Sequence, residues 1–174
     1  MNTERNGSKR LPLLILVYLW LVSAASAQVS LTLTTKDGKS KFRVGEAIEV
    51  ELRFQATESG KYGVWTTSLV RQVRRPEFDH FTVEPGASVT DPLVDSFAQL
   101  SGGGFVGRVP KAAPLSRIPT VVGLPMNEWF SIRHPGHYWI TVETTRVVTT
   151  DNPSTTLTLR SNTIEIDLVK PEPG

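Results

Sequence analysis

Residues 48–54 read IEVELRF, a run in which apolar and charged side chains alternate without a break. Successive side chains of a β-strand point to opposite faces, so this run predicts a strand with one buried and one exposed face. Other runs that alternate or are rich in β-forming residues lie at 29–33, 62–73, 78–83, 138–142, 155–159 and 164–168. No long stretch has a helical period, which makes a parallel α/β fold unlikely and predicts an all-β chain.

The composition excludes several classes of protein. The 174 residues include no cysteine, so disulfides, thiolate nucleophiles, cysteine-ligated zinc and iron–sulfur clusters are excluded. The formal net charge of +2 arises within residues 1–27, and the rest of the chain has equal numbers of acidic and basic side chains. The charge therefore gives no argument for nucleic-acid binding, and no nucleic-acid partner is expected.

Residues 1–27 have the order of a secretory signal peptide. Three basic residues precede the apolar run 11–22, and the small residues Ala25-Ser26-Ala27 fit a cleavage site. The apolar run is short for a membrane span, which needs about 20 residues. We expect a secreted or periplasmic protein that meets the membrane only through this segment, whether the segment is cleaved or retained.

One domain is expected over residues 28–170, followed by a tail at 171–174. Residues 85–125 interrupt its strand pattern with six prolines and the run Gly102-Gly103-Gly104. Proline cannot donate to a sheet ladder, so this stretch is predicted to be an irregular insertion at one end or edge of the sheets. We expect this segment either to pack against the sheets or to serve a function.

One short helix is predicted inside this insertion. Asp91 can cap the free amides of a first turn, and Pro92 suits the first helical position. An apolar stripe follows at helical spacing, and Gly102 can end the helix. The stripe consists of Leu93, Phe97 and Leu100.

Two stretches carry a resemblance to a known kind of domain. Residues 42–54 read FRVGEAIEVELRF, and residues 129–142 read WFSIRHPGHYWITV. Together they resemble immunoglobulin-like β-sandwich domains of exported bacterial proteins, a family of unknown function. The resemblance implies an antiparallel sandwich, with the first stretch pairing into one sheet and the second beginning a late core strand. Antibody-type domains match poorly because their inter-sheet cysteine pair is absent, and such a fold does not determine function.

The chain has no strong catalytic or metal-binding motif. Gly102-x-Gly104-x-x-Gly107 follows a predicted helix rather than a strand, so it does not fit a dinucleotide site. His134 and His137 flank a Pro-Gly turn, and Asp79-His80 has no nucleophile elbow nearby. We predict a non-enzymatic protein without cofactor or metal, and keep as an alternative a hydrolase or metal enzyme that uses these histidines.

The candidate ligand-binding residues are mainly aromatic. Alternation places Trp139 opposite the apolar Tyr138 and Ile140, so it faces outward or under the insertion. Exposed aromatic side chains mark binding sites more often than exposed aliphatic ones do. The predicted ligand-binding residues are Trp139, Trp65, Phe105 and Arg117.

The leading functional prediction is an exported, non-enzymatic binding or accessory module. Its expected partner is a protein or a glycan of the cell envelope. One alternative is a secreted proteinase inhibitor that inserts the loop 110–125 into a protease, with Lys111 and Arg117 as specificity residues. The second alternative is a carbohydrate-binding module that uses Trp139.

Overall fold

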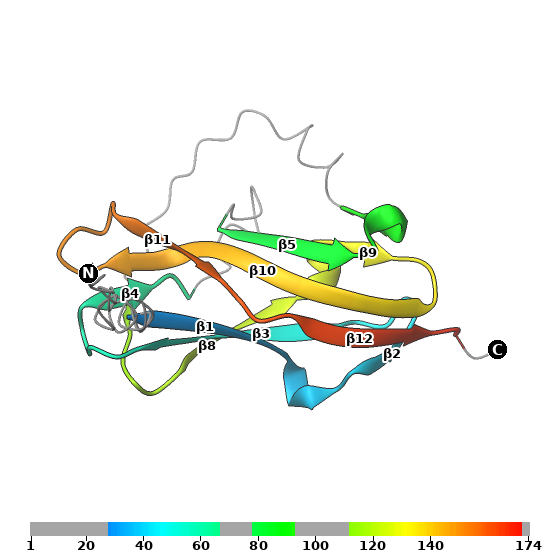
Figure 1. The fold of residues 1–174 in the computed structure, drawn as a ribbon, viewed down its shortest axis with the longest axis horizontal. Coiled ribbons are helices and arrows are strands. Elements are labelled where there is room, and N and C mark those ends of the chain that lie inside the picture. Colours follow the sequence, from blue (N-terminus) through cyan, green and yellow to red (C-terminus); the bar gives the residue numbers. More distant parts are fainter. Residues whose placement is uncertain (1–27, 67–77, 93–111, 172–174) are drawn as a thin grey trace, which may run out of the picture.

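The structure is a computed structural model that describes residues 28–66, 78–92 and 112–171 (Figure 1). These residues form twelve β-strands and three single-turn 3-10 helices. The all-β prediction is confirmed. Within these ranges no helix is long and apolar enough to cross a membrane.

The first sheet has three antiparallel strands in the order β1-β3-β8. They are β1 (Val29–Thr35), β3 (Glu49–Ala56) and β8 (Thr120–Pro125). The predicted alternation of residues 48–54 is confirmed, since every apolar side chain of that run is buried. Leu52 pairs with Leu33 on one side and with Val122 on the other, which makes β3 the central strand.

The second sheet has seven strands and is organised by β10 (Gly136–Thr149). On one side of β10, β12 pairs with its first part and β11 with its second part. On the other side, β5 pairs with the first part and β4 with the second. Strands β2 and β7 extend the sheet beyond β12 and β4. The bounds are β2 (Lys41–Arg43), β4 (Tyr62–Val64), β5 (Asp79–Glu84), β7 (Ala113–Pro114), β11 (Thr156–Arg160) and β12 (Ile164–Val169).

The second sheet is mixed rather than wholly antiparallel. Strand β2 runs parallel to β12, with Phe42 opposite Leu168. Sequence periodicity could not find β2, because three residues are too few to show a period of two.

Short elements complete the described part of the chain. Strands β6 (Val89–Thr90) and β9 (Ser131–Ile132) pair with each other. The 3-10 helices are η1 (Lys36–Gly38), η2 (Gly86–Ser88) and η3 (Met126–Glu128). In η1, Asp37 and Gly38 both have positive φ, a conformation that Asp and Gly adopt in turns.

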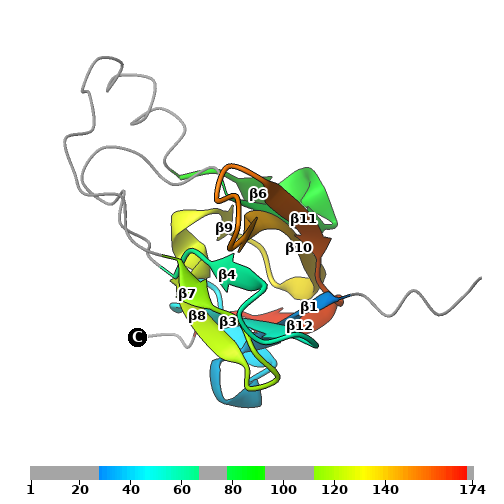
Figure 2. The ribbon, with the colours of Figure 1, turned by 90° about the vertical axis from the view of Figure 1, so that its left-hand side faces the viewer.

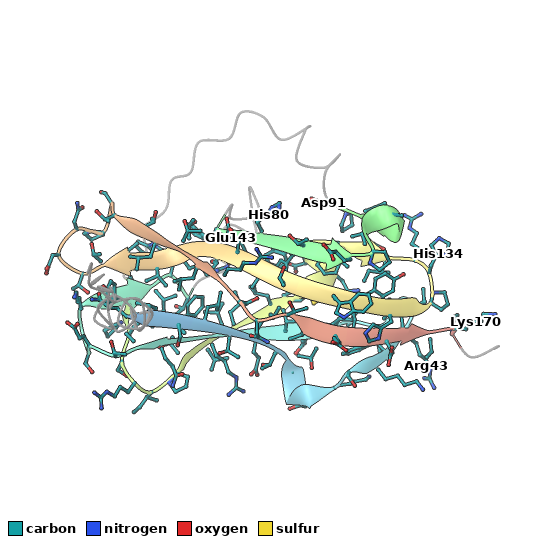
Figure 3. The ribbon with its side chains drawn as sticks, viewed as in Figure 1. Arg43, His80, Asp91, His134, Glu143 and Lys170 are labelled. Atoms are coloured by element: carbon teal, nitrogen blue, oxygen red, sulfur yellow. The ribbon has the colours of Figure 1, made fainter. Side chains whose placement is uncertain are left out.

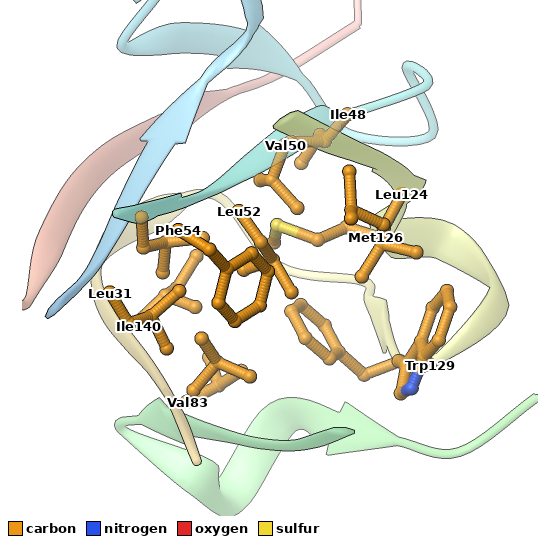
Figure 4. Close-up of a cluster of buried hydrophobic side chains, with 14 of the residues drawn as sticks. Leu31, Ile48, Val50, Leu52, Phe54, Val83, Leu124, Met126, Trp129 and Ile140 are labelled. Atoms are coloured by element: carbon orange, nitrogen blue, oxygen red, sulfur yellow. The ribbon is translucent and has the colours of Figure 1, made fainter. Parts of the chain in front are cut away.

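The two sheets face each other across one hydrophobic core (Figures 1 and 2). Leu52 and Phe54 of β3 meet the inward side chains of β10, such as Ile140 (Figure 4). Met126 and Trp129 contribute to the same core from η3 and the residue after it. This two-layered arrangement fixes which face of each strand reaches solvent.

The prediction of an irregular insertion over 85–125 is wrong for its last part. Strands β7 and β8 lie inside it, and Leu115, Val122 and Leu124 are buried. The prolines permit this because Pro119 precedes β8 and Pro125 ends it. The helix predicted from Asp91 lies outside the described residues from position 93 onward, as do Phe105 and the glycine motif at 102–107.

Strand β8 is an edge strand among the described residues. The amide of Met126 donates to the carbonyl of Ile48 (2.8 Å), and hydrogen-bonded pairs recur at every second residue of an antiparallel ladder. The amides of Val121 and Gly123 therefore point away from β3. Pro119 and Pro125 occupy the next positions of the same series and have no amide to offer, which limits pairing with another chain.

Candidate binding surface on the outer sheet face

The outer face of the second sheet displays the alternate residues of β10. Tyr138 and Ile140 are buried, whereas the side chain of Trp139 between them is 44% exposed. Figure 3 shows His80 and Glu143 on the same outer side of the β5–β10 layer, away from the three-stranded sheet. The outward position predicted for Trp139 is confirmed.

Two carboxylates flank Trp139 across the strands. Its register partners are Glu84 on β5 and Glu165 on β12, both exposed. Side chains directly opposite each other in an antiparallel pair have Cβ atoms about 4.5–5.5 Å apart. Among the described residues, the carboxylate of Glu84 has no ion-pair or hydrogen-bond partner. The indole therefore stands in a row between two acidic side chains.

His137, two residues before Trp139 on β10, contacts two carboxylates of β12. His137 Nδ1 lies 2.7 Å from Asp167 Oδ1, and its Nε2 lies 3.3 Å from Glu165 Oε2. The hydrogen bond to Asp167 and the nearby carboxylate charges raise the pKa of His137 above its usual value, against a smaller opposing effect of desolvation. The imidazole also packs edge-to-face on Trp139, with ring centroids 4.6 Å apart at 76°. His137 thus links the acidic groups of β12 to the indole.

We call the group of Trp139, His137, Glu84, Glu165 and Asp167 the Trp139 surface. It combines an accessible aromatic ring with hydrogen-bond acceptors on a sheet whose central strand is paired on both sides. A rigid scaffold of this kind holds a ligand without a large loss of protein conformational entropy. An exposed aromatic ring beside hydrogen-bond acceptors is an arrangement that can contact a ligand.

The other predicted binding residues lie elsewhere. Trp65 is half-buried, and its backbone pairs with Arg146, roughly 20 Å along β10 from Trp139. Arg117 is exposed beside the first sheet, where its Nε donates to the carbonyl of Thr57 (3.4 Å). Phe105 is outside the described residues. The structure therefore does not bring Trp139, Trp65 and Arg117 into one site.

The histidine candidates for catalysis are not assembled in the described part of the chain. Asp79 is buried and His80 exposed, so the two side chains lie on opposite faces of β5. His134 is exposed, and its carbonyl accepts a hydrogen bond from the Tyr138 hydroxyl (3.0 Å). Within the described ranges, no group of three or more histidine, aspartate or glutamate side chains is placed to hold a metal ion.

Sequence reasoning missed a fully buried ion pair between Arg146 and Asp79. Arg146 Nε lies 2.9 Å from both carboxylate oxygens of Asp79, and Nη2 donates to Oδ2 at 2.6 Å. Thr144 Oγ1 also donates to Asp79 Oδ1 (2.7 Å), and Arg146 Nη1 to the carbonyl of Trp65 (2.9 Å). A register shift in β10 between Thr144 and Val147 accompanies the inward arginine. The only signal in the sequence was an arginine beside two valines near the end of a strand.

No family model, curated protein or solved structure matches this chain.

Proposed function

We propose that the chain is an exported, non-enzymatic binding or accessory module with an immunoglobulin-like β-sandwich fold. Its ligand, a protein or glycan of the cell envelope, binds at the Trp139 surface. The exposure of Trp139 between two carboxylates is the observation that supports this proposal. The signal-like order of residues 1–27 supports export.

Trp139 differs from the other large exposed apolar residues of the described structure. Ile118, which is 78% exposed, lies before the edge strand β8, and Val121, which is 45% exposed, lies within it. Trp139 instead lies on the central strand of its sheet, with polar neighbours on both flanks. An aromatic ring with a polar rim is the usual centre of a protein or sugar contact.

The test compares ligand binding by Trp139→Ala and Ile118→Ala variants of the full chain. Each variant is applied to a glycan array containing envelope polysaccharides and to an array of synthetic peptides, and its fold is checked by circular dichroism. We expect binding that Trp139→Ala removes and Ile118→Ala preserves. Binding that survives Trp139→Ala in a folded protein, or no binding to either array, contradicts the proposal.

A proteinase inhibitor is a second candidate, supported by the short connection before β8. Arg117 and Ile118 are exposed there, and the side-chain amide of Gln55 donates to the Arg117 carbonyl (3.0 Å). Because residues 120–125 form β8, the loop available to a protease is shorter than the predicted 110–125. Inhibition of a trypsin-like protease that Arg117→Ala abolishes supports this function, whereas no inhibition across a protease panel rules it out.

A further inference from the structure

We infer that the Trp139 surface binds a cationic side chain, an arginine of a partner polypeptide, stacked on the indole between Glu84 and Glu165. This inference rests on the proposed binding function and names the chemistry of its ligand. Three observations carry it: the charge of the surface, the spacing of its carboxylates and the kind of hydrogen-bonding groups it offers.

The charge around Trp139 is negative although residues 28–174 are balanced overall. The acidic groups are Glu84, Glu165 and Asp167. The positive groups near them are Lys41, which pairs with Asp167 in the register of β2 and β12, Arg43 two residues further along β2, and the titratable His137. Lys41 and Arg43 lie beyond β12, on the side of β10 opposite to Glu84. Glu84 has no ion-pair partner among the described residues. A cation bound beside it would therefore be attracted by a carboxylate that no other described group neutralises.

The spacing of Glu84, Trp139 and Glu165 across the three strands fits a flat cation. Neighbouring strands lie about 4.8 Å apart, so carboxylates on β5 and β12 flank the β10 indole on both sides. A guanidinium group stacks on an aromatic face and has donors pointing outward in its plane. Such a group on Trp139 can donate to Glu84 or Glu165 while it lies on the ring. An ammonium group is a point donor and cannot match this geometry as well.

The available hydrogen-bonding groups favour a donor-rich ligand over a neutral sugar. Ionised carboxylates only accept hydrogen bonds. The two ring nitrogens of His137 already face Asp167 and Glu165. The hydroxyls of a sugar stacked on Trp139 could also donate to these carboxylates, but they would bring no positive charge to neutralise them. An arginine neutralises them as it covers them.

The test measures binding of dye-labelled synthetic peptides to the full chain by fluorescence anisotropy at pH 8 and low salt. One peptide carries arginine at alternate positions, and its matched control carries citrulline, which has the same shape without the charge. We expect the arginine peptide alone to bind, with affinity falling as salt is added. Glu84→Gln should weaken binding about threefold and Trp139→Ala about fivefold or more.

Two variants serve as matched controls. Glu58→Gln removes an exposed carboxylate near Lys61, in the loop after β3, and Ile118→Ala removes an exposed apolar side chain. Neither should change the affinity for the arginine peptide. Equal binding of the citrulline peptide, or an unchanged affinity in folded Glu84→Gln, overturns the inference.

The outcomes separate this inference from the proposed function. Glycan binding that depends on Trp139 but is unaffected by Glu84→Gln overturns the arginine ligand and leaves the binding module in place. No Trp139-dependent binding to either peptides or glycans overturns both.

Discussion

Replacing Arg146 by methionine should destabilise the fold more than any surface substitution. Both partners of the Arg146–Asp79 pair have fully buried side chains. The methionine keeps most of the apolar stem but removes the guanidinium donors to Asp79 and to the Trp65 carbonyl. The Asp79 carboxylate would keep the hydrogen bond from Thr144, without a positive charge beside it.

The expected loss is about 3–5 kcal/mol in the free energy of unfolding, the usual effect of removing one partner of a buried ion pair. For a domain of this size each kcal/mol shifts the unfolding midpoint by about 2–4 °C, so Tm should fall by roughly 6–20 °C. Replacing both partners, as in Asp79→Val with Arg146→Met, should recover much of the loss, because no buried charge then remains unpaired.

Urea unfolding followed by circular dichroism measures these changes, and the two single variants with the double variant complete a thermodynamic cycle. Lys36→Met serves as the control, since the Lys36–Glu49 pair is exposed and should contribute little. A loss below about 1 kcal/mol in Arg146→Met, or a double variant less stable than both singles, would refute the role assigned to the pair.

Three further predictions concern the core, a close backbone approach and pH. Leu52→Ala should lower the free energy of unfolding by about 2–5 kcal/mol in the same urea assay, because a fully buried side chain of the central strand β3 leaves a cavity. Gly63→Ala should cost about 1–3 kcal/mol by overpacking, since the added Cβ would lie 3.0 Å from the Cβ of Ala112; an unchanged midpoint would mean that this neighbour yields. The raised pKa of His137 means that its stabilising contribution is fully present below the unfolded-state pKa near 6.5 and is lost as pH rises through the higher folded-state pKa. Tm measured from pH 6 to pH 9 should therefore show a gap between wild type and His137→Gln that narrows as pH rises, and a constant gap would contradict this linkage.

Much of the fold could be predicted because period-two alternation reports burial directly. The outward Trp139 and the buried run of β3 both follow from that rule. The rule has no signal for short strands, which is why β2 was missed. It also misplaced β8, because prolines that border an edge strand look the same in sequence as prolines that exclude one.

The candidate site was only partly predictable for a related reason. Alternation identifies Trp139 as exposed, but strand pairing decides which side chains stand beside it. Glu84 and Glu165 are separated by 81 positions in the sequence, and only the register of three strands places them on either side of one indole. The Arg146–Asp79 pair depends on a register shift that no local pattern encodes.

The backbone of β10 at Thr145 and Arg146 has a consequence for protein engineering. The chain leaves β4 at Trp65, whose amide donates to the Arg146 carbonyl, and it returns at Phe78, whose carbonyl accepts from the Thr145 amide. Neighbouring residues of β10 thus hold Trp65 and Phe78, the described residues on either side of the segment 67–77, beside one strand. A reporter peptide joined between Trp65 and Phe78 would therefore begin and end beside adjacent residues of β10, on a cysteine-free chain.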